Sequence, residues 1–147
     1  MPLILDGNRV RDQIKAECRP RVDRVVAHAG RAPGLAVILA GSDPASQIYV
    51  RGKTKTAGDL GIYNETITPS ADISTDELCS LIHSLNHRPE IDGILVQLPL
   101  PKQIDEQRVL LEVAPEKDAD GFHPMARPAA KKFRAHAVNT FFYLALS

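Results

Sequence analysis

Ser46, Tyr49 and Lys53 are residues whose types and spacing could do chemistry. They stand at i, i+3 and i+7, so a helix would carry a hydroxyl, a phenol and an amine along one side. An aromatic ring can stack on a flat ligand, and a lysine partly withdrawn from water can act as an acid or a base near neutral pH. The simpler interpretation is an amphipathic face on which Lys53 extends its amine into solvent.

The local sequence predicts the helix that would carry these side chains. Asp43 is a suitable N-cap, and Pro44 suits the first helical position because its missing N–H has no partner there. We expect the helix to run from Pro44 to about Leu60. The apolar segment Gly34–Ala40 precedes it and is typical of a central parallel strand. The polar stripe would therefore begin at the carboxyl end of a strand, where open α/β sheets build their sites.

Two later junctions also carry polar groups. Gln97 ends an apolar segment, and the alternating Pro99 and Pro101 that follow cannot continue a central strand. Asp118 and Asp120 lie in a later acidic loop. Parallel strands would bring the three junctions to one edge of the sheet. A carboxylate and a carboxamide there suit a heterocycle that displays N–H donors and a carbonyl.

Each of these groups has a simpler interpretation. Gln97 could satisfy local backbone groups at the end of a strand, and Asp118 and Asp120 could be turn residues. His83 and His87 could form a metal pair, but without a third ligand in view, helix-end stabilisation or solvent exposure is the better interpretation. The coincidence of polar groups at three junctions favours a binding site.

The alternation of strands and helices predicts an α/β fold, a three-layer α/β/α arrangement with an open, mainly parallel sheet. Pro20 predicts a kink or a break in the first helix. The expected elements, in order, are a short strand at Leu3–Leu5, a helix over about Arg9–Ala29, strand Gly34–Ala40, helix Pro44–Leu60, strand Ile62–Thr68, a helix from Ser74 to about Leu85, strand Ile91–Gln97 and a helix from Asp105 to about Val113.

Composition limits the function classes. The chain has 147 residues, and its 18 basic and 18 acidic side chains balance, so there is no overall electrostatic argument for nucleic-acid binding. Cys18 and Cys79 lack CxxC spacing and are interpreted as core thiols in a reducing compartment. No apolar run has the length of a signal peptide or a membrane span, so we expect a cytoplasmic protein without a membrane partner.

Neither common phosphate-binding loop is present, because the sequence contains no G-x-G-x-x-G and no G-x-x-x-x-G-K. The segment after residue 120 is basic, with Arg127, Lys131, Lys132 and Arg134 and no acidic residue. Four charges without interleaved readout residues are weak support for a nucleic-acid partner.

Three long motifs in this order resemble the bifunctional methylenetetrahydrofolate dehydrogenase/methenyltetrahydrofolate cyclohydrolase family, of the FolD type. They are GSDPASQIYVRGKTK at 41–55, GILVQLPLP at 93–101 and PEKDADGFHP at 115–124. The resemblance is collinear from about Leu5 to Pro124 and corresponds to the family's N-terminal, folate-binding catalytic domain.

The resemblance implies roles for the residues identified above. Lys53 matches the catalytic lysine, Tyr49 the tyrosine that packs on the aminobenzoate ring of folate and helps to place that lysine, and Gln97 the glutamine that partners it. Asp120 matches the aspartate that holds the pterin ring. The same cleft would be lined by Ser46 and by the loop Leu98, Pro99, Leu100 and Pro101.

The family's chemistry is NADP-dependent oxidation of 5,10-methylenetetrahydrofolate to the methenyl form, followed by hydrolysis to 10-formyltetrahydrofolate. The resemblance implies tetrahydrofolate derivatives as ligands, a homodimer, no metal, and a place in one-carbon metabolism and purine biosynthesis.

After Pro124 the sequence departs from the family pattern. We expect residues 1–124 to form the catalytic domain and residues 125–147 a divergent tail in place of the start of the NADP-binding, Rossmann-like domain, which we expect to be absent together with its cofactor-binding residues. The dehydrogenase step would then be impaired, whereas hydrolysis needs no dinucleotide. The alternatives are a non-catalytic folate-binding or dimerisation module, and an inactive fragment.

Overall fold

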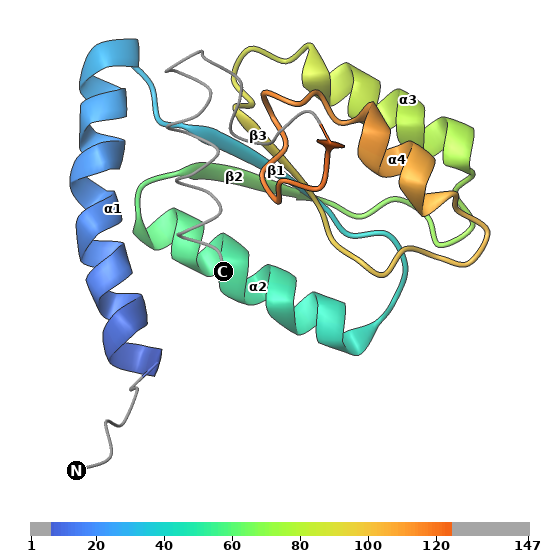
Figure 1. The fold of residues 1–147 in the computed structure, drawn as a ribbon, viewed down its shortest axis with the longest axis horizontal. Coiled ribbons are helices and arrows are strands. Elements are labelled where there is room, and N and C mark those ends of the chain that lie inside the picture. Colours follow the sequence, from blue (N-terminus) through green and yellow to red (C-terminus); the bar gives the residue numbers. More distant parts are fainter. Residues whose placement is uncertain (1–6, 125–147) are drawn as a thin grey trace.

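The computed structural model of this protein describes residues 7–124, which form alternating helices and strands (Figure 1). The expected strand at Leu3–Leu5 and the segment 125–147 lie outside the described residues. The elements are α1 (Gly7–Ala29), β1 (Gly34–Ile38), α2 (Pro44–Asp59), β2 (Tyr63–Ile67), α3 (Thr75–Asn86), β3 (Gly93–Val96) and α4 (Glu106–Glu112).

The strands form a parallel sheet in the order β2-β1-β3. Ala36 of β1 lies opposite Glu65 of β2 on one side and Ile94 of β3 on the other. Beyond β3, the Ile94 N–H donates to the carbonyl of Lys117 at 2.6 Å, and the Ala119 N–H donates to the carbonyl of Ile94 at 3.1 Å. The acidic loop is therefore attached to the sheet beside β3, and the expectation of an open parallel sheet is confirmed.

Helices cover both faces of the sheet, as the three-layer prediction requires. In Figure 1, α2 lies along one face and α3 and α4 lie over the other. The first layer is packed with Cys18, Val22, Leu35, Val37, Leu39, Val50, Ala57, Leu60, Ile62 and Leu95. The second is packed with Ala36, Ile38, Leu78, Ile82, Leu85, Ile91, Ile94, Val96 and Val109. Strands β1 and β3 are buried throughout, whereas β2 is partly exposed, as its edge position dictates.

Three predicted N-caps are present with their hydrogen bonds. The Asp43 carboxylate accepts from the Ser46 N–H at 2.7 Å at the start of α2. Ser74 and Glu77 form a capping box at the start of α3. Asp105 accepts from the Arg108 N–H at 3.1 Å at the start of α4. Each cap satisfies a backbone donor that the helix itself leaves unpaired, which fixes where each helix begins.

Helix α1 does not break at Pro20, contrary to one of the two outcomes expected there: it is a single helix from Gly7 to Ala29. Proline removes the hydrogen bond to the carbonyl four residues earlier, that of Ala16. Ala16 is exposed, so water can satisfy that carbonyl. Cys18 and Val22, on either side of the proline, are buried in the core and hold the adjacent turns in place.

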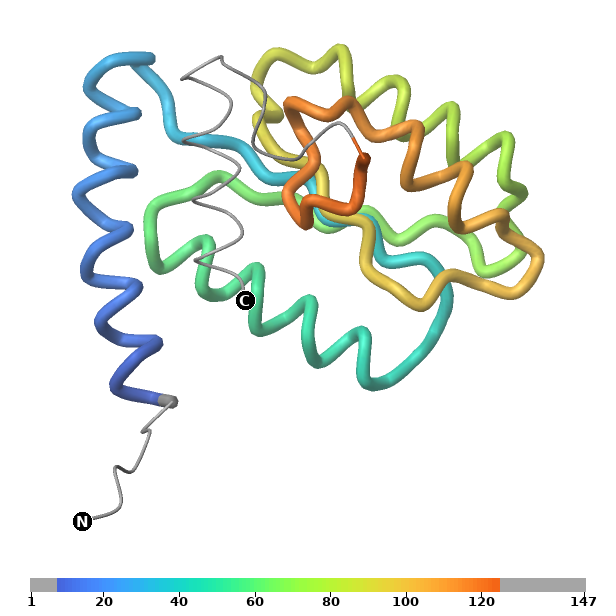
Figure 2. Tube along the Cα trace, in the orientation of Figure 1, coloured from blue at the N-terminus to red at the C-terminus, as the bar shows by residue number. Residues whose placement is uncertain are grey.

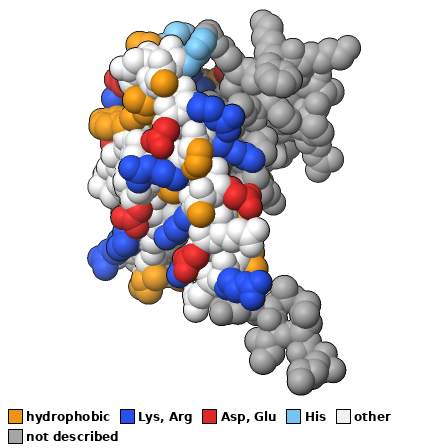
Figure 3. All heavy atoms as spheres, turned by 90° about the vertical axis from the view of Figure 1, so that its left-hand side faces the viewer, with side chains coloured by type: hydrophobic (Ala, Val, Ile, Leu, Met, Phe, Trp, Pro, Cys, Tyr) orange, Lys and Arg blue, Asp and Glu red, His pale blue; other side chains and the backbone are white. Residues whose placement is uncertain are grey.

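The outer surface of α1 is polar and of mixed charge. Figure 3 faces this side of the molecule, where basic and acidic side chains alternate over the helix with scattered apolar ones. This face therefore offers no concentrated basic patch. Within residues 7–124, no helix combines the length and the apolar character needed to cross a bilayer.

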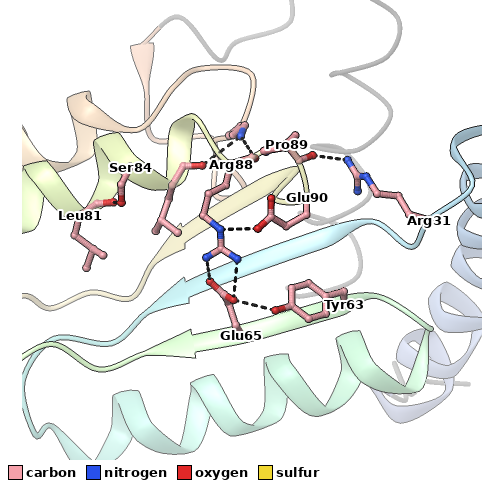
Figure 4. Close-up of polar contacts among 10 residues, drawn as sticks. Arg31, Tyr63, Glu65, Leu81, Ser84, Arg88, Pro89 and Glu90 are labelled. Atoms are coloured by element: carbon pink, nitrogen blue, oxygen red, sulfur yellow. Dashed lines mark hydrogen bonds and ion pairs between the residues drawn. The ribbon is translucent and has the colours of Figure 1, made fainter.

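A charge cluster joins β2 to the segment between α3 and β3 (Figure 4). The Arg88 guanidinium donates to the Glu65 carboxylate at 2.5 and 3.3 Å and to Glu90 at 2.8 Å. The Tyr63 hydroxyl donates to Glu65 at 3.0 Å, and this hydrogen bond raises the pKa of Tyr63. The cluster ties the edge strand to the loop that leads into β3.

Candidate functional site

The chain segments that leave β1 and β3 run side by side beyond the carboxyl ends of these strands (Figure 2). The Ser46 hydroxyl of α2 lies 3.3 Å from the carbonyl of Leu98, which follows β3. Gly41 has φ +92°, a conformation that L side chains rarely adopt, and the position of a Cβ on it would lie 3.5 Å from Cγ of Pro101. The first two polar junctions predicted from the sequence therefore meet at one edge of the sheet.

Helix α2 presents its three polar residues in different ways. Tyr49 is 64% exposed, and Lys53 is half-buried. Ser46 is only 3% exposed, and its hydroxyl lies 2.8 Å from the Asp43 carboxylate as well as near Leu98. Ser46 thus joins the start of α2 to the loop after β3, while Tyr49 and Lys53 remain accessible from outside.

Gln97 has one amide atom with a partner and one without. Its Nε2 donates to the Leu98 carbonyl at 2.9 Å, as the local-backbone interpretation predicted. Its Oε1 is buried and has no hydrogen-bond partner among the described residues. A buried acceptor without a donor destabilises the fold by about 1–3 kcal/mol. This oxygen therefore marks a place where a donor from a ligand or a mobile side chain would be favourable.

The loop after Gln97 is anchored at one residue and open at another. Leu100 packs against the core beneath α3 and α4. Leu98 and Pro101 are half-buried, and Pro99 is exposed. The loop can therefore offer an apolar surface to a ligand without itself being free to move away from the sheet.

Asp118 and Asp120 differ sharply, although they are two residues apart. Asp118 is 6% exposed, and its carboxylate accepts the backbone N–H groups of Asp120, Gly121 and His123 at 3.2, 3.0 and 2.7 Å. For Asp118 the turn interpretation is confirmed. Gly121 has φ +72°, the left-handed conformation that such a turn needs.

Asp120 lies close enough to Lys53 to sense its charge. Burial raises the pKa of the Asp120 carboxyl, the positive charge of Lys53 opposes that rise, and the negative charge of Asp118 adds to it. The charge of Lys53 on α2 thus acts on the carboxyl of the third junction. An exposed phenol, an amine, a carboxylate and a buried amide oxygen come from positions up to 71 residues apart in the chain, between Tyr49 and Asp120.

Comparison with known proteins shows the family of this chain. The family model described as tetrahydrofolate dehydrogenase/cyclohydrolase, catalytic domain, matches residues 5–120. The chain belongs to this family.

Curated relatives of this family member are called bifunctional protein FolD. The protein from Solibacter usitatus is 64% identical over 124 residues, which are 84% of this chain and 40% of the relative. The protein from Koribacter versatilis is 56% identical over 122 residues, which are 83% of this chain and 39% of the relative. The chain thus spans about 40% of the length of these curated relatives.

Solved structures of the family share the fold. The 5,10-methylenetetrahydrofolate dehydrogenase of the silkworm Bombyx mori superimposes with a TM-score of 0.80 at 46% identity, over 84% of this chain and 42% of that one. The FolD methylenetetrahydrofolate dehydrogenase/cyclohydrolase of Campylobacter jejuni gives 0.79 at 40% identity, over 84% and 43%. These likenesses agree with the architecture described above.

The histidine pair of this family member lies at the end of α3, and its helix-end interpretation is confirmed. His87 is the C-cap residue, and its Nδ1 lies 2.8 Å from the carbonyl of His83. Nδ1 of His83 lies 3.4 Å from the Glu112 carboxylate. In the described part of the chain, no three His, Cys, Asp or Glu side chains gather closely enough to hold a metal ion.

Two apolar side chains beside the site were passed over by the sequence analysis. Ile48 is 68% exposed next to Tyr49 in the chain, and Phe122 is 53% exposed two residues after Asp120. Their signal in the sequence is a large apolar residue between polar neighbours. Periodicity alone assigns such a residue to a core, and only the structure reveals that it is exposed.

Proposed function

We propose that this chain binds tetrahydrofolate derivatives at the carboxyl edge of its sheet and hydrolyses 5,10-methenyltetrahydrofolate to 10-formyltetrahydrofolate. The observation that carries the proposal is the buried, unpartnered Oε1 of Gln97 at the carboxyl edge of the sheet, where Ser46 of α2 meets the carbonyl of Leu98. The family to which the chain belongs, and the collinear match of its motifs, support the choice of ligand.

Tyr49, Lys53 and Gln97 would act on the reacting end of the ligand. The exposed Tyr49 ring offers a flat surface on which the aminobenzoate ring can stack. The amine of Lys53 is the group that exchanges a proton with water. The unpartnered Oε1 of Gln97 would accept a hydrogen bond from the Lys53 amine and hold it toward the ligand.

Asp120 would bind the pterin ring. Its carboxylate can accept two parallel hydrogen bonds from adjacent N–H groups of the heterocycle. Because the Asp120 carboxyl is withdrawn from water, such hydrogen bonds face less competition from solvent. Ser46 would support the cleft from behind, where it joins Asp43 to Leu98, and Leu98, Pro99, Leu100 and Pro101 would line it.

The hydrolysis balances with water and a proton acceptor alone. Water attacks the carbon that bridges N5 and N10 of the cationic methenyl form, so a C–O bond forms. The Lys53 amine acts as the base that takes one proton from that water. When the C–N5 bond breaks, N5 receives the second proton, and the formyl group remains on N10. One proton is released to solvent in each turnover.

The dehydrogenase step of the family needs a dinucleotide, and we derive no step through it for this chain. The related Trypanosoma brucei FolD structure is described as a complex with NADP, so NADP is the cofactor expected by family. The sequence contains neither common phosphate-binding loop, and we assign no residue of this chain to the dinucleotide. On family grounds we also propose residues 1–124 as the folate-binding domain, 125–147 as a divergent tail, a cytoplasmic homodimer, and a supply of one-carbon units to purine biosynthesis.

The experiment that tests this function follows the decay of methenyltetrahydrofolate absorbance with purified protein. We expect the wild type to accelerate the decay over a buffer blank, and Lys53→Ala to match the blank. Lys55→Ala is the matched control, because Lys55 lies two residues away on the same helix and pairs with Asp59 on the surface. It should behave as the wild type.

Equal decay in the wild type and the blank would exclude catalysis by this chain. Calorimetric titration with tetrahydrofolate would then decide between the alternatives. Binding without turnover would identify a folate-binding module, and no binding at all would leave an inactive fragment.

A further inference from the structure

Asp118 is a nearly buried carboxylate at the turn that carries Asp120. One of its oxygens accepts the N–H groups of Asp120 and Gly121, and the other accepts the N–H of His123. The chain from residue 120 to residue 123 is thus wrapped around the Asp118 side chain. These are hydrogen bonds to a charged acceptor, which are stronger than those between neutral groups.

The segment before this turn is held by other contacts. Ile94 of β3 bonds to the backbone of Lys117 and Ala119. The Lys117 amine donates to the carbonyls of Arg88 and Leu85 at 2.8 and 3.3 Å, at the end of α3. Residues 117–119 are therefore fixed to the sheet and to the end of α3 by contacts that do not involve the Asp118 side chain. The Asp118 side chain in turn fixes residues 120–123 through its three hydrogen bonds.

We propose that Asp118 is a positioning residue for folate binding: it holds the 120–123 turn and thereby fixes the position of the Asp120 carboxylate. The inference rests on the proposed function, because it assigns to Asp118 the placement of the group that binds the pterin. Asp118 itself is too deeply buried to contact the ligand, so it acts through Asp120.

The geometry requires a carboxylate at position 118. Both oxygens of Asp118 accept, and all three partners are N–H donors. An asparagine has one accepting oxygen and one donating nitrogen. In either orientation of its amide, that nitrogen would face an N–H group, so at least one of the three bonds would be replaced by a repulsive donor pair. Asp118→Asn is therefore a nearly isosteric change that loosens the turn.

The test compares the full chain with Asp118→Asn, Asp120→Asn and the double variant, in calorimetric titrations with tetrahydrofolate and in methenyltetrahydrofolate hydrolysis. We expect Asp118→Asn to raise the Kd and the KM about tenfold, with kcat within about twofold of wild type. In the Asp120→Asn background, the same substitution should change Kd by less than about twofold, because the residue through which it acts is already disabled.

Asp92→Asn is the matched control. Like Asp118, Asp92 holds backbone through its carboxylate: it accepts the Gly34 N–H at 2.8 Å and pairs with Arg31, although it is only half-buried. It lies at the amino ends of β1 and β3, away from the site. It should lower thermal stability as Asp118→Asn does, but leave Kd and KM unchanged. An equal rise of KM in both variants, or a Kd effect of Asp118→Asn that persists beside Asp120→Asn, would overturn the inference.

Amide hydrogen exchange makes the structural part independent of folate. Exchange at Asp120, Gly121 and His123 should quicken at least tenfold in Asp118→Asn, while Ala119, bonded to Ile94, should be unchanged. Unchanged exchange at the three amides would show that the Asp118 carboxylate does not hold the turn. If the exchange quickens but the wild type binds no tetrahydrofolate, the proposed function fails, and Asp118 is a structural residue only.

Discussion

At the scale of single residues, Gln97 shows how a binding site differs from a core in which every buried polar atom has a hydrogen-bond partner. Its Nε2 has a backbone partner, whereas its buried Oε1 has none among the described residues. The sequence could place Gln97 at the end of a strand, and it left open whether the side chain served the backbone or a ligand. The structure divides the two roles between the two amide atoms.

Gln97→Met should therefore separate stability from function. Methionine has a similar volume, loses one hydrogen bond of about 1 kcal/mol, and removes an unsatisfied acceptor that destabilises the fold by about 1–3 kcal/mol. We expect the free energy of unfolding in urea to be unchanged or slightly higher, while hydrolysis falls by about tenfold or more. Gln103→Met, which removes the hydrogen bonds of Gln103 Nε2 to Ala71 and Ile73, is the control and should keep full activity. A strongly destabilised Gln97→Met protein would contradict this account.

Asp120 gives a prediction for pH. Burial raises the pKa of its carboxyl, so this side chain takes up a proton at a higher pH than an ordinary aspartate. Binding of the pterin needs the carboxylate, so tetrahydrofolate affinity should fall as pH drops through this raised pKa. Asp120→Asn should bind weakly without that pH dependence, measured by titrations between about pH 4 and 8.

Stability should change in the opposite direction. Because the folded state favours the protonated Asp120 carboxyl, the wild type should lose stability relative to Asp120→Asn as pH rises from the unfolded pKa through the folded one. The measurement is the difference between the wild type and Asp120→Asn. If acidification lowered both the affinity and the stability of the wild type relative to this variant, the assignment to Asp120 would be wrong.

At the scale of elements, the helices and strands within residues 7–124 were largely predictable, because their signals are local. Asp43, Ser74 and Asp105 cap the helices that they were expected to cap. All three strands are shorter than expected: β1 ends at Ile38, β2 covers Tyr63–Ile67 and β3 covers Gly93–Val96. Of the two outcomes expected at Pro20, the break does not occur, because a helix tolerates proline where the freed carbonyl meets water.

The N-caps should separate element stability from function. Ser74→Ala removes the capping box of α3 and should lower the free energy of unfolding by about 1 kcal/mol without changing hydrolysis. Asp43→Ala should also destabilise its helix, but it additionally releases Ser46, which connects α2 to Leu98. It should therefore reduce folate affinity as well. Urea unfolding and titration of both variants test this, and an equal loss of affinity in both would refute the special role of the α2 cap.

At the scale of the whole molecule, the carboxyl ends of the strands carry the candidate site, whereas the amino ends carry structural contacts. The carboxyl ends carry Lys53, Gln97 and Asp120 in positions that leave groups accessible or unpaired. The amino ends are closed by structural contacts, in which Arg31 forms two hydrogen bonds to Asp92 at 2.7 and 2.9 Å. The sequence predicted the first end from polar residues at the junctions. It could not predict the second, because these contacts join residues about 60 positions apart without a local pattern.

Gly34 gives the sharpest test of the closed end. Its N–H donates to Asp92, and a Cβ added to it would lie 1.9 Å from the carbonyl oxygen of Glu90, a backbone atom that cannot turn aside. Gly34→Ala should therefore force β1 and the loop before β3 apart, and lower the free energy of unfolding by about 3 kcal/mol or more. Gly52→Ala, in α2, is the control: a Cβ there meets nothing within 4 Å, and alanine favours the helix, so stability should rise by about 0.5–1 kcal/mol. Urea unfolding compares the two variants, and a Gly34→Ala protein as stable as wild type would show that the amino end of the sheet is not closed as described.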